Sequence, residues 1–282
     1  MAEKNLTQLI SESLTRKDLK LPIFNRTALK LQELIGQNDY CAQDVADIIQ
    51  QDQALASHIL KVANSSFYMG LNPVKTLANA ATRLGGNTLV GLAYMVTQRE
   101  MYHTRVKQFR PWIASLWNHA LGAAVASKWL AQNMGYQTAA EEAFMAGLLH
   151  DIGKLLLMRI IDELMVKGEV RGKVSVNLVL EIMADMHAEY GRIYLETINM
   201  PESYSKVAGN HHNPDVSGDN VVLNLVRLGN MTCHKLGIGM KQTPGLMLST
   251  TPEALNLMAK DILLAELQVK LEEHIALVNQ SF

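Results

Sequence analysis

Apolar residues recur three and four positions apart along most of the chain. Two long examples are "QDVADIIQQDQALASHILKVAN" at 43–64 and "LWNHALGAAVASKWLAQNMG" at 116–135. This spacing is typical of α-helices, and the strict alternation with hairpin turns that marks strands is not found. Only "VSVNLVL" at 174–180 has a strand-like composition, and it runs directly into a helical pattern. The pattern therefore predicts an all-α protein.

Proline, glycine and capping residues indicate where the predicted helices begin and end. Pro111 suits the first turn of a helix, and Gly135 suits its end. Thr138, three residues before a glutamate, has the spacing of a capping box at the start of the next helix. The apolar pattern is interrupted near 101–111 and again near 213–220, without the composition of a flexible linker. We therefore expect one helical body with a C-terminal helical extension.

Composition narrows the class of protein. The chain has 282 residues, 48% hydrophobic and 19% charged, with a formal net charge of −1, as in ordinary soluble globular proteins. It has no basic field for nucleic acid and no apolar run of about 20 residues for a membrane. The N-terminus lacks the apolar region of a signal peptide. Cys41 and Cys233 are far apart and outside any CxxC motif, so we expect reduced thiols in a cytoplasmic protein.

One short stretch departs from this helical pattern. Within "AFMAGLLHDIGKLLLM" at 143–158, His150 and Asp151 stand side by side in a run that otherwise predicts a buried helix. A buried charge is costly unless it is paired or bound to a metal. These two residues are therefore either part of a metal site or the remnant of one.

Several further histidines fall beside small or apolar residues in the central and later helices. A single histidine there is most simply a hydrogen-bonded core residue, and His58, His103, His234 and His274 keep that interpretation. Together with a carboxylate, however, several imidazoles suit a divalent transition metal (iron, manganese, zinc or nickel) better than calcium. Spacing alone leaves both interpretations open for the set His119, His150, Asp151, His187, His211 and His212.

The same residues carry a resemblance to a known family. His119, "HDIGK" at 150–154, His187 and "HH" at 211–212 resemble the HD superfamily of metal-dependent phosphohydrolases. The N-terminal half resembles one particular family within this group. It resembles the HDOD domain, the HD-related output domain of bacterial signalling proteins, in the stretches "LPIF" at 21–24, "DVADIIQQDQALASHILKVANSSFY" at 44–68 and "AATRLGG" at 80–86.

The resemblance implies a fold and a domain arrangement. We expect an all-α, multi-helix HD-like bundle with an N-terminal helical half. Residues 1–14 then form an N-terminal segment, and 15–215 form the HDOD domain, with the metal-site part at about 111–215. Residues 216–282 form a C-terminal helical extension packed on the same body.

The resemblance also assigns roles to individual residues. The five histidines and Asp151 become candidate ligands of one or two metal ions, and Asp151 is the residue expected to bridge two of them. Lys154, one helical turn after His150, is either a solvated lysine or a residue that meets a substrate phosphate. In the second case it forms the candidate catalytic pair with Asp151. The superfamily pattern closes with an aspartate, and its counterpart here is Asn230. An amide oxygen can still coordinate, but it brings no negative charge.

Two functions remain open at this point. The first is a regulatory signalling module that retains an HD-type metal site and binds partner proteins. The second is a metal-dependent phosphohydrolase of weak or lost activity, acting on a phosphoester or nucleotide. Asn230 favours the first function, and the retained ligands favour the second. Cyclic di-GMP is not expected as a substrate, because "HHNPDVSGDN" lacks the Gly-Tyr-Pro element of the enzymes that cleave it. Neither membrane nor nucleic-acid partners are expected.

Overall fold

The computed structural model describes residues 6–15, 26–36, 39–64, 68, 72–170, 174–213 and 219–281. Over these ranges the regular structure is entirely helical, which confirms the predicted fold class. In chain order the α-helices are α1 (Leu6–Thr15), α2 (Arg26–Gly36), α3 (Ala42–Gln50), α4 (Gln53–Ala63), α5 (Leu77–Leu84), α6 (Gly86–Met101), α7 (Arg110–Asn133), α8 (Ala140–Leu149), α9 (Ile152–Val166), α10 (Val176–Thr197), α11 (Glu202–Asn210), α12 (Val221–Leu236), α13 (Pro252–Asn256) and α14 (Asp261–Ser281). Short 3-10 turns are η1 (Lys107–Phe109), η2 (Gln137–Ala139) and η3 (Leu248–Thr250).

The helix ends follow the local sequence in most places. Pro111 stands in the first turn of α7, and the chain leaves that helix through Gly135 at a φ of 84°, so both predictions are confirmed. Thr138 does not cap α8, and that prediction was wrong. Residues 137–139 form η2, which makes Ala139 the N-cap residue, with no side-chain hydrogen bond. The strand-like stretch at 174–180 enters α10 at Val176.

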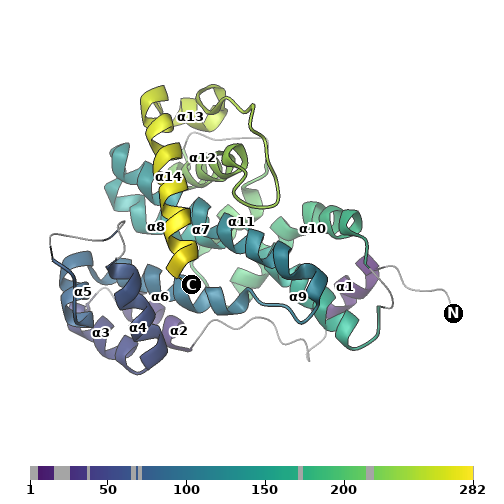
Figure 1. Ribbon diagram of the computed structural model, residues 1–282, viewed down its shortest axis with the longest axis horizontal. Helices are drawn as coiled ribbons and strands as arrows, with labels where there is room; N and C mark the ends of the chain where they lie inside the picture. The colour runs from purple at the N-terminus through teal and green to yellow at the C-terminus, as the bar shows by residue number, and fades with distance from the viewer. Residues whose placement is uncertain are drawn as a thin grey trace.

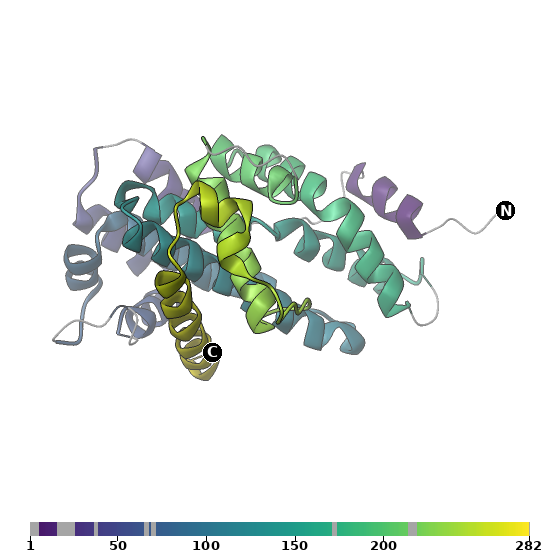
Figure 2. The same cartoon turned by 90° about the horizontal axis from the view of Figure 1, so that it is seen from above.

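Helix α7 is the centre of the molecule. It packs against α8, α12 and α14, while α9 and α10 pack together at one end and α2–α6 gather at the other (Figure 1). From above, α1 lies at the α9–α10 end, where Ser11 and Tyr190 approach to 3.4 Å (Figure 2). α14 lies across α7 (Figure 1).

Glycines allow α8 and α12 to approach α7 closely. A Cβ on Gly147 of α8 would lie 2.9 Å from the Ala123 carbonyl oxygen, and one on Gly229 of α12 would lie 3.2 Å from the same atom. Both contacts fall one helical turn after His119. His150 lies one helical turn after Gly147, and Asn230 directly follows Gly229. The close packing therefore brings both residues to the level of His119 in the bundle.

A buried carboxylate fixes the connection between α6 and α7. Asp162 of α9 accepts hydrogen bonds from Thr104 Oγ1 at 2.6 Å and from the backbone amides of Arg105 and Val106, each at 3.0 Å. Burial would raise the pKa of Asp162, but these hydrogen bonds and the Arg105 guanidinium together lower it. The segment entering α7, the helix that carries His119, is thus held in place.

Among the described residues, none of the helices combines the length and the apolar character needed to cross a bilayer. Both cysteines are free thiols: Cys41 is exposed and Cys233 is buried.

Candidate metal centre

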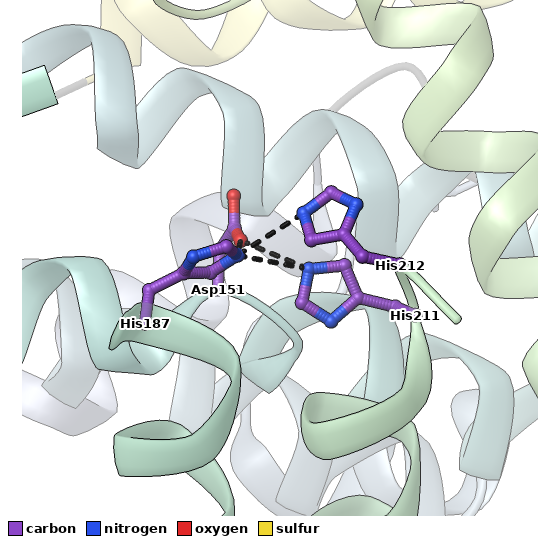
Figure 3. A group of neighbouring side chains, drawn as sticks. All are labelled: Asp151, His187, His211 and His212. Atoms are coloured by element: carbon purple, nitrogen blue, oxygen red, sulfur yellow. Dashed lines mark hydrogen bonds and ion pairs between the residues drawn. The ribbon is translucent and has the colours of Figure 1, made fainter. Parts of the chain in front are cut away.

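The structure brings together six side chains that span 94 positions in the sequence. His119 comes from the middle of α7, and His150 and Asp151 lie at the junction between α8 and α9. The other three are His187 of α10 and, directly after α11, His211 and His212. Figure 3 shows Asp151 and these last three side chains pointing toward one another.

The helix end explains how two adjacent histidines can serve one site. Neighbouring residues on a regular helix point about 100° apart. His211 is the C-cap residue of α11 and His212 lies in the following turn, so the chain turns between them. Their ring centroids are consequently only 4.1 Å apart.

One group of ligand atoms surrounds Oδ1 of Asp151. The Nε2 atoms of His187 and His211 each lie 3.3 Å from this oxygen. The same two nitrogens are 3.3 Å from each other, and Nε2 of His212 is 3.1 Å from that of His187. All four donor atoms lie within 4.8 Å of one another, which is the arrangement of a four-ligand metal site.

A second group surrounds Oδ2 of the same carboxylate. Nε2 of His119 lies 3.4 Å away and Nε2 of His150 lies 3.5 Å away. These three residues also offer donor atoms within 4.8 Å of one another. Asp151 therefore presents one oxygen to each group, as a carboxylate that bridges two ions does.

These distances match the edges of a metal coordination polyhedron. With metal–ligand bonds of about 2.1 Å, donor atoms on one ion lie about 3.0 Å apart along an octahedral edge and about 3.4 Å apart along a tetrahedral edge. The donor separations above run from 3.1 to 3.5 Å. The residues present therefore fit a transition-metal ion in each group.

Backbone carbonyls set the tautomer of four of the histidines. Nδ1 of His119 donates to Ile238 O at 3.0 Å, and Nδ1 of His150 donates to Gly147 O at 2.7 Å. The Nδ1 atoms of His187 and His211 bond in the same way to the carbonyls of Met183 and Ala208. With the proton on Nδ1, the lone pair of each Nε2 points inward, as metal-ligating imidazoles require.

The buried charges agree with this interpretation. Burial holds the pKa of His150 well below its ordinary value and lowers the pKa of His187 to about 4. Burial would raise the pKa of Asp151, but the Lys154 ammonium and the neighbouring imidazoles outweigh it and hold that pKa well below its usual range. Neutral imidazoles around an ionised carboxylate are the protonation state that metal binding needs.

Unpartnered polar atoms point to an occupant. Nε2 of His119, Nε2 of His150 and Oδ1 of Asp151 are buried, and none has a hydrogen-bond partner among the described residues. A buried polar atom without a partner is costly. A cation in each group would satisfy these atoms: one at Oδ1 of Asp151, the other at Nε2 of His119 and His150.

A close helix contact holds the two sides of the first group together. A Cβ on Gly153 of α9 would lie 1.9 Å from the carbonyl oxygen of His187 and 2.8 Å from the Gly191 amide of α10. Only glycine leaves room for α10 at this position. Because α10 packs this closely on α9 at Gly153, His187 lies next to Asp151, which is two residues before Gly153.

A cavity of about 490 Å³ opens onto the cluster. Lys154 lies at its wall, with Nζ 2.6 Å from Asp151 Oδ2, so both candidate catalytic residues border the cavity. This volume lies within the range of small-molecule sites. The cavity is also lined by the apolar side chains of Leu116, Leu180, Met183, Ala184 and Met240.

Asn230 is buried on α12, and its Oδ1 has no hydrogen-bond partner among the described residues. It lies one turn before His234, whose ring stacks on His119 with centroids 5.2 Å apart and planes 8° apart. The sequence pattern predicts a core residue at His234, but this side chain lines the cavity. Its four-residue spacing from Asn230, which puts both on one helix face, is the signal that could have revealed it.

Comparisons with known proteins agree with the fold. The HDOD domain family matches residues 21–214. An HDOD domain protein of unknown function from Geobacter sulfurreducens has a TM-score of 0.78 and 20% identity, over 98% of each chain. A protein from Shewanella amazonensis SB2B, provisionally described as a metal-dependent phosphohydrolase, has a TM-score of 0.71 and 20% identity, over 94% of this chain and 99% of its own.

A curated relative is similar over part of its length. An uncharacterized protein of Treponema pallidum (strain Nichols) is 26% identical over 212 residues, which is 73% of this chain and 40% of the relative. The chain thus spans about two fifths of the length of the curated relative it matches.

Proposed function

The chain belongs to the HDOD domain family, and we propose that it acts as a bacterial signalling module built around a metal centre of the HD type. One observation carries the proposal: Asp151 stands between two groups of inward-facing imidazole nitrogens, one group at each of its oxygens. In four of the histidines, a hydrogen bond from Nδ1 to a backbone carbonyl turns Nε2 toward Asp151. This orientation is expected of metal ligands and not of the remnant of a lost site.

In this proposal Asp151, His187, His211 and His212 hold one ion, and His119, His150 and Asp151 hold the other. Imidazole and carboxylate donors suit iron, manganese, zinc or nickel. When bound, such ions supply positive charge that attracts phosphoryl oxygens and lowers the pKa of water. The protein's own contribution is orientation, together with the Lys154 ammonium, which adds a cation at the wall of the cavity.

Elemental analysis of untagged protein, purified without added metal, tests this proposal. We expect at least one equivalent of a transition metal in the wild type and none in Asp151→Ala, because the variant removes the ligand common to both groups. Asp185→Ala, which removes an exposed carboxylate on α10, is the matched control and should keep its metal. Equal and negligible metal in all three proteins would refute the metal centre.

A metal-dependent phosphohydrolase is the second candidate, and the cavity favours it. The metal ligands are not sealed in the core, since Asp151, Lys154 and His212 line a space large enough for a phosphorylated small molecule or nucleotide. The neutral Asn230 argues for weak turnover, because it contributes no charge to the His119 group. Asn230→Asp should raise metal occupancy and the hydrolysis of bis(4-nitrophenyl) phosphate with manganese or iron. If the wild type is inert and the variant gains nothing, only the regulatory module remains.

Signalling proteins as partners, a phosphorylated small molecule or nucleotide as ligand, and a cytoplasmic location complete the proposal.

A further inference from the structure

The segment after α12 covers the metal centre, although it lies outside the stretch matched to the family. We call residues 237–243 the roof segment. Its Ile238 carbonyl accepts the hydrogen bond from His119 Nδ1 at 3.0 Å. At Gly239, which has a φ of 120°, a Cβ would lie 2.9 Å from the Cβ of His119 and 3.0 to 3.1 Å from its ring atoms Nδ1 and Cγ. The roof segment therefore rests directly on a candidate metal ligand.

Backbone hydrogen bonds hold the roof segment in this position. Gly237 ends α12 in the left-handed conformation, with a φ of 70°. The Ile238 amide donates to Cys233 O at 2.9 Å, and the Thr243 amide donates to His234 O at 2.7 Å. Both ends of the loop at 238–243 are therefore hydrogen-bonded to the last turn of α12. This loop carries Met240 and Lys241 to the wall of the cavity.

Lys241 differs from the other lysine of this cavity. The Lys154 ammonium is paired with Asp151 at 2.6 Å. Lys241 has no ion pair or hydrogen bond with any of the described residues. Burial is the main cause that lowers the pKa of the nearby His234, and the charge of Lys241 adds to it. Asp151 is the only carboxylate among the residues that line the cavity. An unpaired ammonium therefore borders a cavity whose floor is the metal centre.

We propose that Lys241 binds an oxyanion of the ligand, most simply a phosphoryl oxygen, while the other oxygens of that group face the metal centre. This inference rests on the proposed function, since without metal ions the cavity lacks its second source of positive charge. It makes Lys241 a ligand-binding residue supplied by the C-terminal extension. The apolar side chains of Leu116, Met183 and Met240 then face the remainder of the ligand.

The experiment uses full-length, manganese-loaded protein and methylphosphonate, a phosphate analogue that cannot be hydrolysed. Its Kd is measured by calorimetry for the wild type, Lys241→Gln, Lys241→Arg and Lys206→Gln. Lys206 lies on α11, paired with Glu202 and away from the cavity, so it is the matched control. We expect Lys241→Gln to raise the Kd about 10-fold, the effect of losing one partly solvated charged hydrogen bond. Lys241→Arg should restore binding, and Lys206→Gln should change nothing.

The metal content of each protein separates the possible failures. If the wild type holds no metal, the proposed function fails and this inference fails with it. If metal is present but methylphosphonate does not bind, or binds Lys241→Gln with an unchanged Kd, only the inference is refuted. Loss of metal from Lys241→Gln would also refute it, because Lys241 would then support the centre rather than the ligand.

Discussion

Gly153→Ala offers a direct test of how the fold builds the candidate metal centre. Two effects of opposite sign compete at this position. Alanine is favoured over glycine in a helix by up to about 1 kcal/mol, and α9 is helical at residue 153. Against this, the added Cβ would lie 1.9 Å from the carbonyl oxygen of His187.

The size of the clash decides between them. Cβ atoms essentially never approach other heavy atoms closer than 3.0 Å, so α9 and α10 must separate by about 1.1 Å or more. The obstacle is backbone, with the Gly191 amide behind it at 2.8 Å, so no side chain can rotate away. Overpacking of this kind costs about 1–3 kcal/mol, more than the gain in helix propensity. Because the displaced carbonyl belongs to His187, its ring moves as well, by several times the roughly 0.2 Å that metal–ligand distances tolerate.

We therefore expect Gly153→Ala to lower the midpoint of urea unfolding and to lose metal from the His187 group. Gly191→Ala is the graded comparison, since its Cβ would meet Gly153 at 3.2 Å and needs a shift of only a few tenths of an ångström. Gly245→Ala, whose Cβ has nothing within 4 Å, is the control. A Gly153→Ala protein more stable than wild type, with its full metal content, would refute the close contact and this account of how His187 is positioned.

Three further perturbations address stability. Asp162→Ala should cost about 3 kcal/mol in urea unfolding, because it leaves the Arg105 amide without its acceptor and the Val106 amide with Thr104 Oγ1 alone; a loss below about 0.5 kcal/mol would contradict that role. Gln98 is fully buried, and neither of its amide atoms has a hydrogen-bond partner among the described residues, so Gln98→Met should raise the melting temperature, with a gain of about 1 kcal/mol. Metal-free protein should lose stability as the pH falls from about 6.5 toward 4, because histidines such as His187, with a folded pKa of about 4, bind protons more readily when unfolded. Melting temperatures in EDTA at pH 7, 6 and 5 test this, and equal values would contradict it.

The sequence by itself determined the helical class and pointed to the side chains that converge at the candidate metal centre. Apolar spacing reports which residues share a helix face, and this information is local, so it survives without any knowledge of the fold. Pro111 and Gly135 act on the backbone of their own helix and could be interpreted in the same way. His150 and Asp151 indicate a site because burying a carboxylate and an imidazole in an apolar run is costly unless they are paired or bound to a metal.

Local sequence patterns were less reliable predictors where the role of a residue depended on the backbone conformation of neighbouring turns. Thr138 has an ideal spacing for a capping box, but a single 3-10 turn moved the N-cap of α8 to Ala139. The local sequence around His234 is that of a core histidine, and only the position of the last turn of α12 stacks its ring on His119. In both cases the sequence held the right residue types, and the backbone conformation decided which of them were used.

Only the tertiary structure decided how the centre is assembled. The hydrogen bond that orients His119 comes from Ile238, which is 119 positions away, and the atom it uses is a carbonyl that every residue possesses. Nothing in the identity of Ile238 marks it for this role. The same holds for Gly153, whose need for hydrogen in place of a methyl group exists only because α10 crosses it at His187. Such contacts depend on the packing of whole helices, which local periodicity does not encode.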